Sequence, residues 1–324
     1  MGKYIGCDLG GTNIKGAIVD SEKGIVYGVR SIPTMAHVGH DAVIDRIAEF
    51  FKAMITDSGI DPKEILGAGV GLPGAIDSRT GLSVFMTNLP DHWVNVPVAD
   101  MLKAKTGLPT FLLNDVNAIT WGELRFGAAR GCSSAVCFAL GTGIGGGIVI
   151  DGNLVLGKTG VAGELGHLVV EPHGNACNCG GRGCLETYAS GPAIRSAAMK
   201  AVAHGGTTIL GELCDYDLNK MEARTVAEAA QKGDKIAIDI YNQAGYYLGI
   251  AVANMIMALE PERVIITGGV AAAGELLLTP IRQVVQERVH VTPLNGITIL
   301  LGELGDNAGV MGNSMWAEKC LNTK

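Results

Sequence analysis

Three cysteines fall within eight positions of one segment, HGNACNCGGRGCLETY at residues 173–188, and a glutamate follows two places after the last. The thiolates of Cys177, Cys179 and Cys184 are suited to binding a metal ion or to redox chemistry. The other five cysteines stand singly in apolar surroundings, as buried free thiols usually do. On spacing alone both interpretations of the cluster stay open, with Glu186 beside it as a candidate functional acid.

A second candidate acid, Asp115, follows a short apolar strand in TFLLNDVNAITWGELRFG and precedes a helix expected to begin near Val116. Ligands bind at the carboxyl ends of strands in open α/β sheets. Phosphoryl transfer to a hydroxyl uses a carboxylate that orients the hydroxyl and accepts its proton. The alternative is that Asp115 caps the helix, a common use of aspartate, and the residues alone do not decide between the two.

Two glycine-rich turns could bind phosphate, because a turn without side chains lets backbone N–H groups approach an anion closely. They lie in DLGGTN at residues 8–13 and in ALGTGIGGG at residues 139–147, and neither matches the P-loop or the dinucleotide-binding pattern. Asp8 of the first copy is alanine in the second. One carboxylate beside paired phosphate turns is expected to hold Mg²⁺ through water. The alternatives are tight hairpins without a ligand and a strand-end hydrogen bond for Asp8.

An internal repeat predicts the elements that position these residues. IGCDLGGTNIKGAIVD, from residue 5, aligns without a gap with VCFALGTGIGGGIVID, from residue 136, and each copy is typical of strand, turn and strand. A second pair of similar segments, ILGAGVGLPG and RVIITGGVAAAG, follows the first pair in the same order along the chain. Amphipathic helices alternate with these strands, for example at residues 41–55, which indicates the α/β class. The repeat places the join near residue 115, and a cleft between two lobes favours small-molecule binding.

Composition and charge narrow the classes of partner. The chain has 324 residues, enough for two domains, and a net charge of −7 with scattered basic residues. It therefore lacks the electrostatic signature of a protein that binds nucleic acid or an anionic membrane. No apolar run approaches the ~20 residues of a membrane span, and the first residues do not form a signal peptide. We expect a cytoplasmic protein with small-molecule ligands.

The motifs together resemble the ROK family of sugar kinases and regulators, and within it the bacterial glucokinases. DLGGTN, GVGLPG, TNLPDHWVNVP, LLNDVNA, LGTGIGGG, GELGH, CNCGGRGCLETYASG and IITGGV occur in the family's order along essentially the whole chain. The resemblance implies a duplicated actin-like (ribonuclease H-like) ATPase fold with two lobes around a central cleft. Residues 1–115, joined by a C-terminal helix at about 306–324, would form the small lobe. Residues 116–305 would form the large lobe with a zinc-binding loop.

The resemblance also implies an activity, the ATP-dependent phosphorylation of the 6-hydroxyl of a hexose. Glucose, converted to glucose 6-phosphate in glycolysis, is the expected substrate. The alternatives are N-acetylglucosamine, N-acetylmannosamine, mannose, allose or fructose, and, in another class, a sugar-sensing ROK regulator. Such regulators carry a DNA-binding helix-turn-helix ahead of the first glycine motif, which here begins at residue 8, so we expect a kinase. Family members are commonly dimers or tetramers, and a homo-oligomer is expected.

The family's functional residues carry over to matching positions of this sequence. Asp115 would be the catalytic base. One imidazole and three thiolates would hold structural Zn²⁺ in a closed site: His167, Cys177, Cys179 and Cys184. The implied sugar-binding residues are Gly74, Asn88, Asn114, Asp115, Glu164, His167 and Glu186. The implied nucleotide-binding residues, for ATP with Mg²⁺, are Asp8, Gly10, Gly11, Thr12, Asn13, Gly141, Thr142, Gly143, Gly268, Gly269 and Val270.

Overall fold

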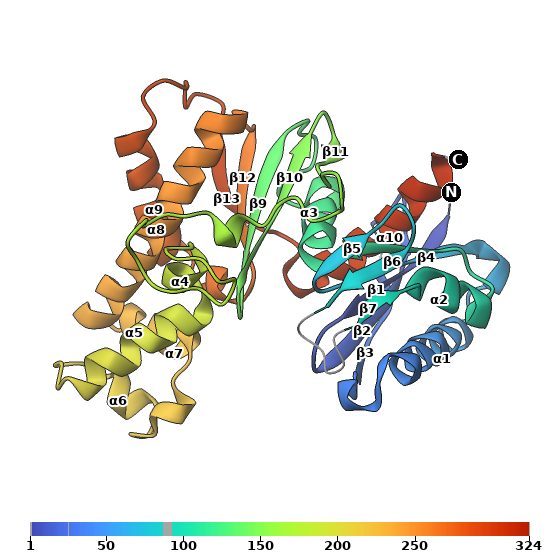
Figure 1. Cartoon of the computed structure of the whole chain (residues 1–324), viewed down its shortest axis with the longest axis horizontal. Helices are drawn as coiled ribbons and strands as arrows, with labels where there is room; N and C mark the ends of the chain where they lie inside the picture. The colour runs from blue at the N-terminus through green and yellow to red at the C-terminus, as the bar shows by residue number, and fades with distance from the viewer. Residues whose placement is uncertain (1, 25, 87–92, 324) are drawn as a thin grey trace. The chain divides into compact units, whose positions relative to one another are not determined.

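The computed structural model describes residues 2–24, 26–86 and 93–323, which form two compact units (Figure 1). Unit 1 comprises Met1–Gly131, Asn153–Gly163 and Glu303–Lys324, and unit 2 comprises Cys132–Gly152 and Glu164–Gly302. The first boundary therefore lies at Gly131 and not near residue 115. The reason is that the helix beginning at Asp115 packs against the C-terminal helix, and both belong to unit 1.

Unit 1 is built on a five-stranded sheet in the order β3–β2–β1–β4–β8. The strands are β1 Lys3–Leu9, β2 Asn13–Asp20, β3 Val26–Pro33, β4 Ile65–Leu72 and β8 Thr110–Asn114. β1 runs antiparallel to β2 and parallel to β4, which is parallel to β8. Because side chains alternate along a strand, Ile5, Cys7 and Leu9 join the core beneath the sheet, whereas Gly6 lies against the C-terminal helix. The alternation places Asp8 on the same face as Gly6.

Helices cover both faces of this sheet. They are α1 His40–Ser58, α2 Val98–Thr106, α3 Asp115–Phe126 and α10 Ala308–Asn322, and a small sheet contains β5 Ala75–Asp77, β6 Leu82–Phe85 and β7 Val94–Val96. α1 buries the apolar face that its sequence predicts, including Val43, Ile47 and Phe51. α10 meets β1 and α3 at glycines: a Cβ on Gly6 would lie 1.8 Å from the Val310 carbonyl oxygen. Backbone-to-backbone packing of this kind allows only glycine there.

The second five-stranded sheet repeats this topology in the order β11–β10–β9–β12–β13. Its strands are β9 Ala135–Leu140, β10 Ile144–Ile150, β11 Asn153–Leu154, β12 Arg263–Thr267 and β13 Thr298–Leu301. β9 runs antiparallel to β10 and parallel to β12, which is parallel to β13, as in the first sheet. The predicted duplication and the α/β class are confirmed, and the architecture is the actin-like ATPase fold.

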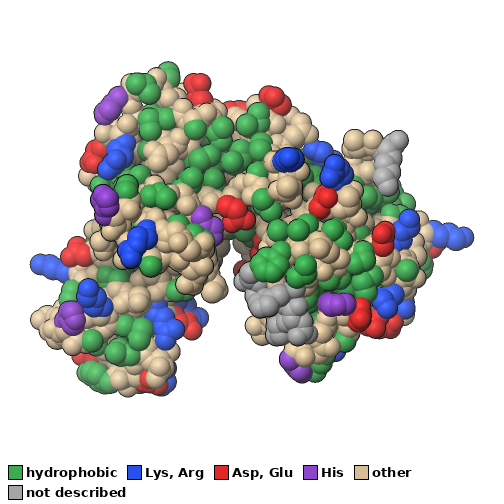
Figure 2. All heavy atoms as spheres, in the orientation of Figure 1, with side chains coloured by type: hydrophobic (Ala, Val, Ile, Leu, Met, Phe, Trp, Pro, Cys, Tyr) green, Lys and Arg blue, Asp and Glu red, His purple; other side chains and the backbone are tan. Residues whose placement is uncertain are grey.

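The helices of unit 2 surround a core that contains β9, β12 and the apolar α8. They are α4 Glu186–Ala189, α5 Gly191–Ala203, α6 Leu210–Leu213, α7 Ala223–Gln231, α8 Lys235–Leu259 and α9 Glu275–Arg288, with the short 3-10 helices η3 Leu165–His167 and η5 Gly269–Ala273. Within the described ranges, no helix has the length and apolarity needed to cross a membrane. Lys and Arg side chains are scattered over the face drawn in Figure 2.

Candidate active site

The turn between β1 and β2 is the first predicted phosphate site. Gly10 N–H donates to the Asn13 carbonyl at 2.9 Å and closes the turn, whose tip residues Gly11 and Thr12 are exposed. Thr34, fully buried, supports it: its amide donates to the Thr12 carbonyl at 2.8 Å and its hydroxyl to the Gly10 carbonyl at 2.7 Å. Sequence reasoning missed Thr34, because no local pattern shows that the residue after β3 meets this turn.

Asp8 lies at the carboxyl end of β1 in an environment that disfavours its charge. Its Oδ1 is buried and receives no hydrogen bond from the residues that the structure describes. Burial, and next the charge of Asp115, raise the pKa of Asp8 to about 7, while Lys15 on β2 lowers it. A Cβ on Gly71 would lie 2.4 Å from Asn313 Nδ2 and 3.1 Å from Asp8 Oδ1, so glycine on the adjacent strand β4 leaves room for both side chains. A desolvated carboxylate without a donor fits the water-mediated cation site that the sequence predicts.

Asp115 is the first residue of α3, and Asn114 caps the helix. Asn114 Oδ1 accepts hydrogen bonds from the amides of Val116 and Asn117 at 3.0 and 3.2 Å, so the capping role belongs to Asn114. Asn114 Nδ2 donates to the Gly74 carbonyl at 3.2 Å, which brings two predicted sugar-binding residues together. The Asp115 carboxylate also accepts from the Val116 amide at 2.9 Å.

The register of the parallel strands brings these residues to the same end of the sheet. β4 and β8 are parallel, and Leu72 pairs with Asn114, so Gly74 and Asp115 leave the sheet at the same edge. Asp8 leaves β1 at that edge too, because Asp8 pairs with Gly71 on β4. The structure thus places both candidate carboxylates at the carboxyl ends of the parallel strands β1 and β8, which flank β4. Asn88, another predicted sugar-binding residue, lies outside the described residues.

The turn between β9 and β10 is the second predicted phosphate site. Gly141 N–H donates to the Gly143 carbonyl at 2.8 Å, and Thr142 is exposed at the tip. Gly268 lies against the end of β9, where a Cβ would come 2.4 Å from the Leu140 carbonyl oxygen, and its φ of 88° is readily adopted only by glycine. The predicted nucleotide residues of unit 2, including Gly269 and Val270 in η5, therefore lie beside one another.

α4 and α5 contact this second turn from one side. The Ile144 amide donates to Glu186 Oε2 at 2.9 Å, and the Gly191 amide donates to the Gly141 carbonyl at 2.9 Å. The contact of Gly191 was not predicted, although the sequence Ser-Gly-Pro indicates a helix start there, with Ser190 as N-cap. A predicted sugar residue and a predicted phosphate turn are thus in direct contact.

The segment GELGH packs on the same strand. A Cβ on Gly166 would lie 1.9 Å from the Ile144 carbonyl oxygen, so η3 presses its backbone against the start of β10. Glu164, just before η3, is exposed, and its carbonyl accepts the His167 amide at 3.1 Å. Glu164 and Glu186 are therefore both placed by segments that contact Ile144.

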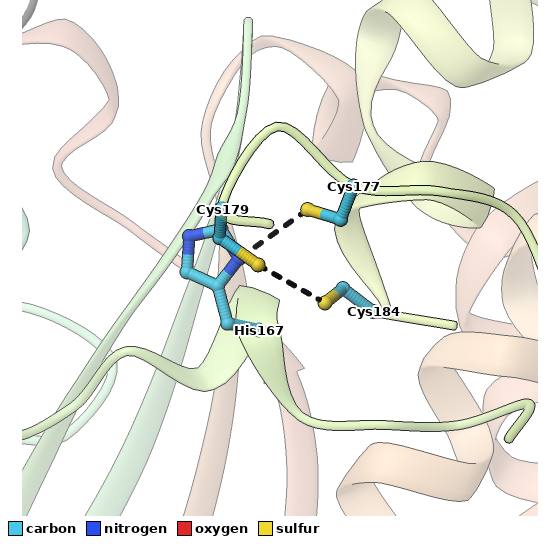
Figure 3. A group of neighbouring side chains, drawn as sticks. All are labelled: His167, Cys177, Cys179 and Cys184. Carbon is cyan, nitrogen blue, oxygen red and sulfur yellow. Dashed lines mark hydrogen bonds between the residues drawn. The ribbon is translucent and has the colours of Figure 1, made fainter. Parts of the chain in front are cut away.

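His167, Cys177, Cys179 and Cys184 point toward one another, as Figure 3 shows. Their ligand atoms all lie within 4.8 Å of one another. Cys177 Sγ is 3.7 Å from His167 Nδ1, and Cys179 Sγ is 3.6 Å from Cys184 Sγ. In a tetrahedron with Zn–S bonds of ~2.3 Å, two sulfurs would be ~3.8 Å apart. The three thiols and one imidazole therefore match the donor set and the size of a four-coordinate zinc site.

The loop that carries the cysteines is held by its own backbone. The Cys177 amide donates to the Gly181 carbonyl at 2.9 Å, and the Gly183 amide to the Asn175 carbonyl at 2.8 Å. Burial, and then the neighbouring thiols Cys179 and Cys177, raise the pKa of Cys184 to about 12. A metal ion bound here would displace this proton, because coordination stabilises the thiolate.

Comparisons with known proteins identify the family of the chain. A model of the ROK family matches residues 4–320. The chain is 40% identical over 310 residues to a glucokinase of Thermotoga maritima, covering 96% of this chain and 95% of that protein. The crystal structure of a ROK family glucokinase from Streptomyces griseus in complex with glucose and AMPPNP is 33% identical, with a TM-score of 0.82 over 98% of this chain and 100% of that one.

A regulator is also related. A xylose repressor of Caldicellulosiruptor bescii is 33% identical over 78% of this chain and 62% of the repressor. Since the family model and the Thermotoga protein each match nearly the whole chain, the protein belongs to the ROK family.

Proposed function

We propose that the protein is an ATP-dependent glucokinase, which transfers the γ-phosphoryl group of ATP to the 6-hydroxyl of glucose. The observation that carries the proposal is the pair of carboxylates, Asp8 and Asp115, at the carboxyl ends of two parallel strands that flank β4. Phosphoryl transfer needs both a cation site near the phosphates and a carboxylate for the attacking hydroxyl. The similarity to glucokinases over nearly the whole chain supports glucose as the sugar.

In unit 1, Asp115 accepts the proton of the 6-hydroxyl while that oxygen forms a bond to the γ-phosphorus and the bond to the departing ADP oxygen breaks. Its position at the start of α3, held by the Asn114 cap, fixes the carboxylate at the strand end. Asn114 and Gly74 contact the sugar, and the exposed turn from Gly10 to Asn13 contacts the phosphates. Asp8 would hold Mg²⁺, and the ion would supply charge neutralisation on the phosphates.

In unit 2, Glu164, His167 and Glu186 accept or share hydrogen bonds with the other sugar hydroxyls. His167 Nδ1 faces Cys177, which leaves Nε2 for a hydroxyl. His167 and the three cysteines would hold a structural Zn²⁺, and the bound ion would fix the two segments that carry Glu164 and Glu186. The turn from Gly141 to Gly143 binds phosphate, and residues 268–270 bind the adenosine end.

The other expectations stay predictions. Another hexose, or a sugar-sensing role like that of the related repressor, is the alternative. We also predict a cytoplasmic homo-oligomer, a dimer or tetramer, without nucleic-acid or membrane partners.

The test is ADP release from Mg-ATP with glucose, mannose, N-acetylglucosamine, N-acetylmannosamine, allose and fructose, reported as kcat/KM for each. We expect a clear preference for glucose. Asp115→Asn should keep the fold and the sugar affinity but lower kcat by ~10²-fold or more, because it removes the proton acceptor. Near-normal turnover of this variant would exclude Asp115 as the base, and a folded, zinc-loaded protein that phosphorylates no sugar would contradict the kinase proposal.

A further inference from the structure

The Glu186 carboxylate serves two sites at once. Oε2 accepts the Ile144 amide at 2.9 Å, at the point where the phosphate turn enters β10. No described residue donates a hydrogen bond to Oε1, which is therefore the oxygen that can accept a sugar hydroxyl. A carboxylate has acceptor sites on both oxygens, so one group can hold both partners together.

The contact with the turn is tight. A Cβ on Gly143 would lie 2.5 Å from Glu186 Oε2 and 4.0 Å from Oε1. Any side chain at position 143 would therefore displace the carboxylate from the Ile144 amide. Glycine at position 143 therefore leaves room for the bond between Glu186 and the Ile144 amide, independently of any need for a phosphate to approach the backbone.

α4 is anchored on its other sides, so the carboxylate cannot shift by moving the helix. Leu185 is fully buried in the core of unit 2, and Cys184 belongs to the group formed by His167 and the three cysteines. The Tyr188 hydroxyl accepts the Asn175 amide at 2.8 Å, and its ring lies 4.1 Å from the Tyr247 ring. With the backbone held, the freedom left to Glu186 is the orientation of its carboxylate.

We propose that Glu186 couples sugar binding to nucleotide binding through the Ile144 amide, an inference that rests on the proposed function. A sugar hydroxyl on Oε1 restricts the orientation of the carboxylate, and Oε2 then holds Ile144 and the turn in the conformation that binds phosphate. The ordering cost of the turn is met when the sugar binds, so the nucleotide binds more tightly afterwards. By linkage, the nucleotide strengthens sugar binding by the same factor.

The experiment measures the Kd of Mg-AMPPNP by calorimetry without glucose and with saturating glucose. The ratio is the Kd without glucose divided by the Kd with glucose. For the wild type we expect a ratio of at least about fivefold, the lower end of usual coupling between sites. Glu186→Gln keeps the shape but only one acceptor oxygen, so its ratio should fall toward one even when glucose is saturating. Gly143→Ala should also lower the ratio, because the added methyl group displaces the Glu186 carboxylate from the Ile144 amide. This second variant tests the coupling if Glu186→Gln does not fold.

Glu164→Gln is the matched control. Glu164 is also proposed to bind the sugar, but its side chain has no described hydrogen bond to the phosphate turn. This variant should bind glucose more weakly and keep the wild-type ratio. If the Kd ratio of Glu186→Gln equals that of the wild type, the coupling proposal is wrong. It is also wrong if the Kd ratio falls equally in Glu164→Gln, because the coupling would then depend on any sugar contact and not on Glu186. A wild-type ratio of one would overturn the coupling alone, whereas a wild type that binds no sugar would overturn the proposed function with it.

Discussion

Asp8→Asn should stabilise the ligand-free protein at alkaline pH while removing its proposed cation site. In the folded chain the pKa of Asp8 is raised from 3.8 to about 7, first by burial and then by Asp115. A raised carboxyl pKa means that the fold favours the protonated form. The stability from this group is fully present below pH 3.8 and is lost as the pH rises through about 7. Asparagine carries no charge at any of these pH values and avoids the loss.

The magnitude follows from the shift. A change from 3.8 to about 7 corresponds to ~4 kcal/mol at pH 8 and ~2 kcal/mol at pH 5.5. The difference in unfolding free energy between Asp8→Asn and the wild type should therefore grow by about 2 kcal/mol between these two pH values. Changes in packing are the same at both and cancel. Urea unfolding in magnesium-free buffer without chelator, so that any zinc is kept, measures this difference.

Asp234→Asn is the control. Although burial opposes it, hydrogen bonds from the amides of Ala237 and Ile209 lower the pKa of Asp234, so its charge does not change between pH 5.5 and 8. Its stability difference from the wild type should be flat over this range. A flat difference for Asp8→Asn as well would refute the reasoning, because Asp8 would then titrate as an exposed carboxylate does. The Asp8 variant should in addition lose Mg-ATP-dependent turnover.

Cys179→Ser should lose bound zinc, measured by metal analysis, and should bind glucose more weakly through Glu186, measured by calorimetry. An unchanged glucose affinity in verified zinc-free protein would mean that the metal only stabilises the fold. Glu123, fully buried, accepts three backbone amides at 2.8 to 3.1 Å. Glu123→Gln turns an N–H toward at least one of them and should cost about 2–3 kcal/mol in urea unfolding, and a loss under about 0.5 kcal/mol would contradict this. Thr34→Val removes the hydroxyl bond to Gly10 and should raise the KM for ATP several-fold without changing the KM for glucose; parallel changes in both would contradict a local role.

The strand and helix pattern could be predicted from the sequence, because local periodicity decides it. The gapless repeat predicted the two strand–turn–strand units that begin the two sheets, and the sequence at residues 41–55 predicted the amphipathic helix α1. The cysteine cluster was visible as well, since three of its four ligands lie within one short loop. His167 was assigned to that cluster only through the family resemblance, and the structure brings it to the thiols.

Contacts between segments distant in the chain were decided only by the tertiary structure. Asp115 could equally have been a helix cap, until the side chain of Asn114 was found in that position. Sequence alone did not show that Thr34 supports the first turn or that Glu186 reaches the second, because the partners in each contact are separated by more than 20 residues. Nor could it show that Oδ1 of Asp8 is buried without a hydrogen-bond donor among the residues that the structure describes. Spacing and composition determine which groups can do chemistry, whereas burial and long-range pairing determine their charge and their neighbours.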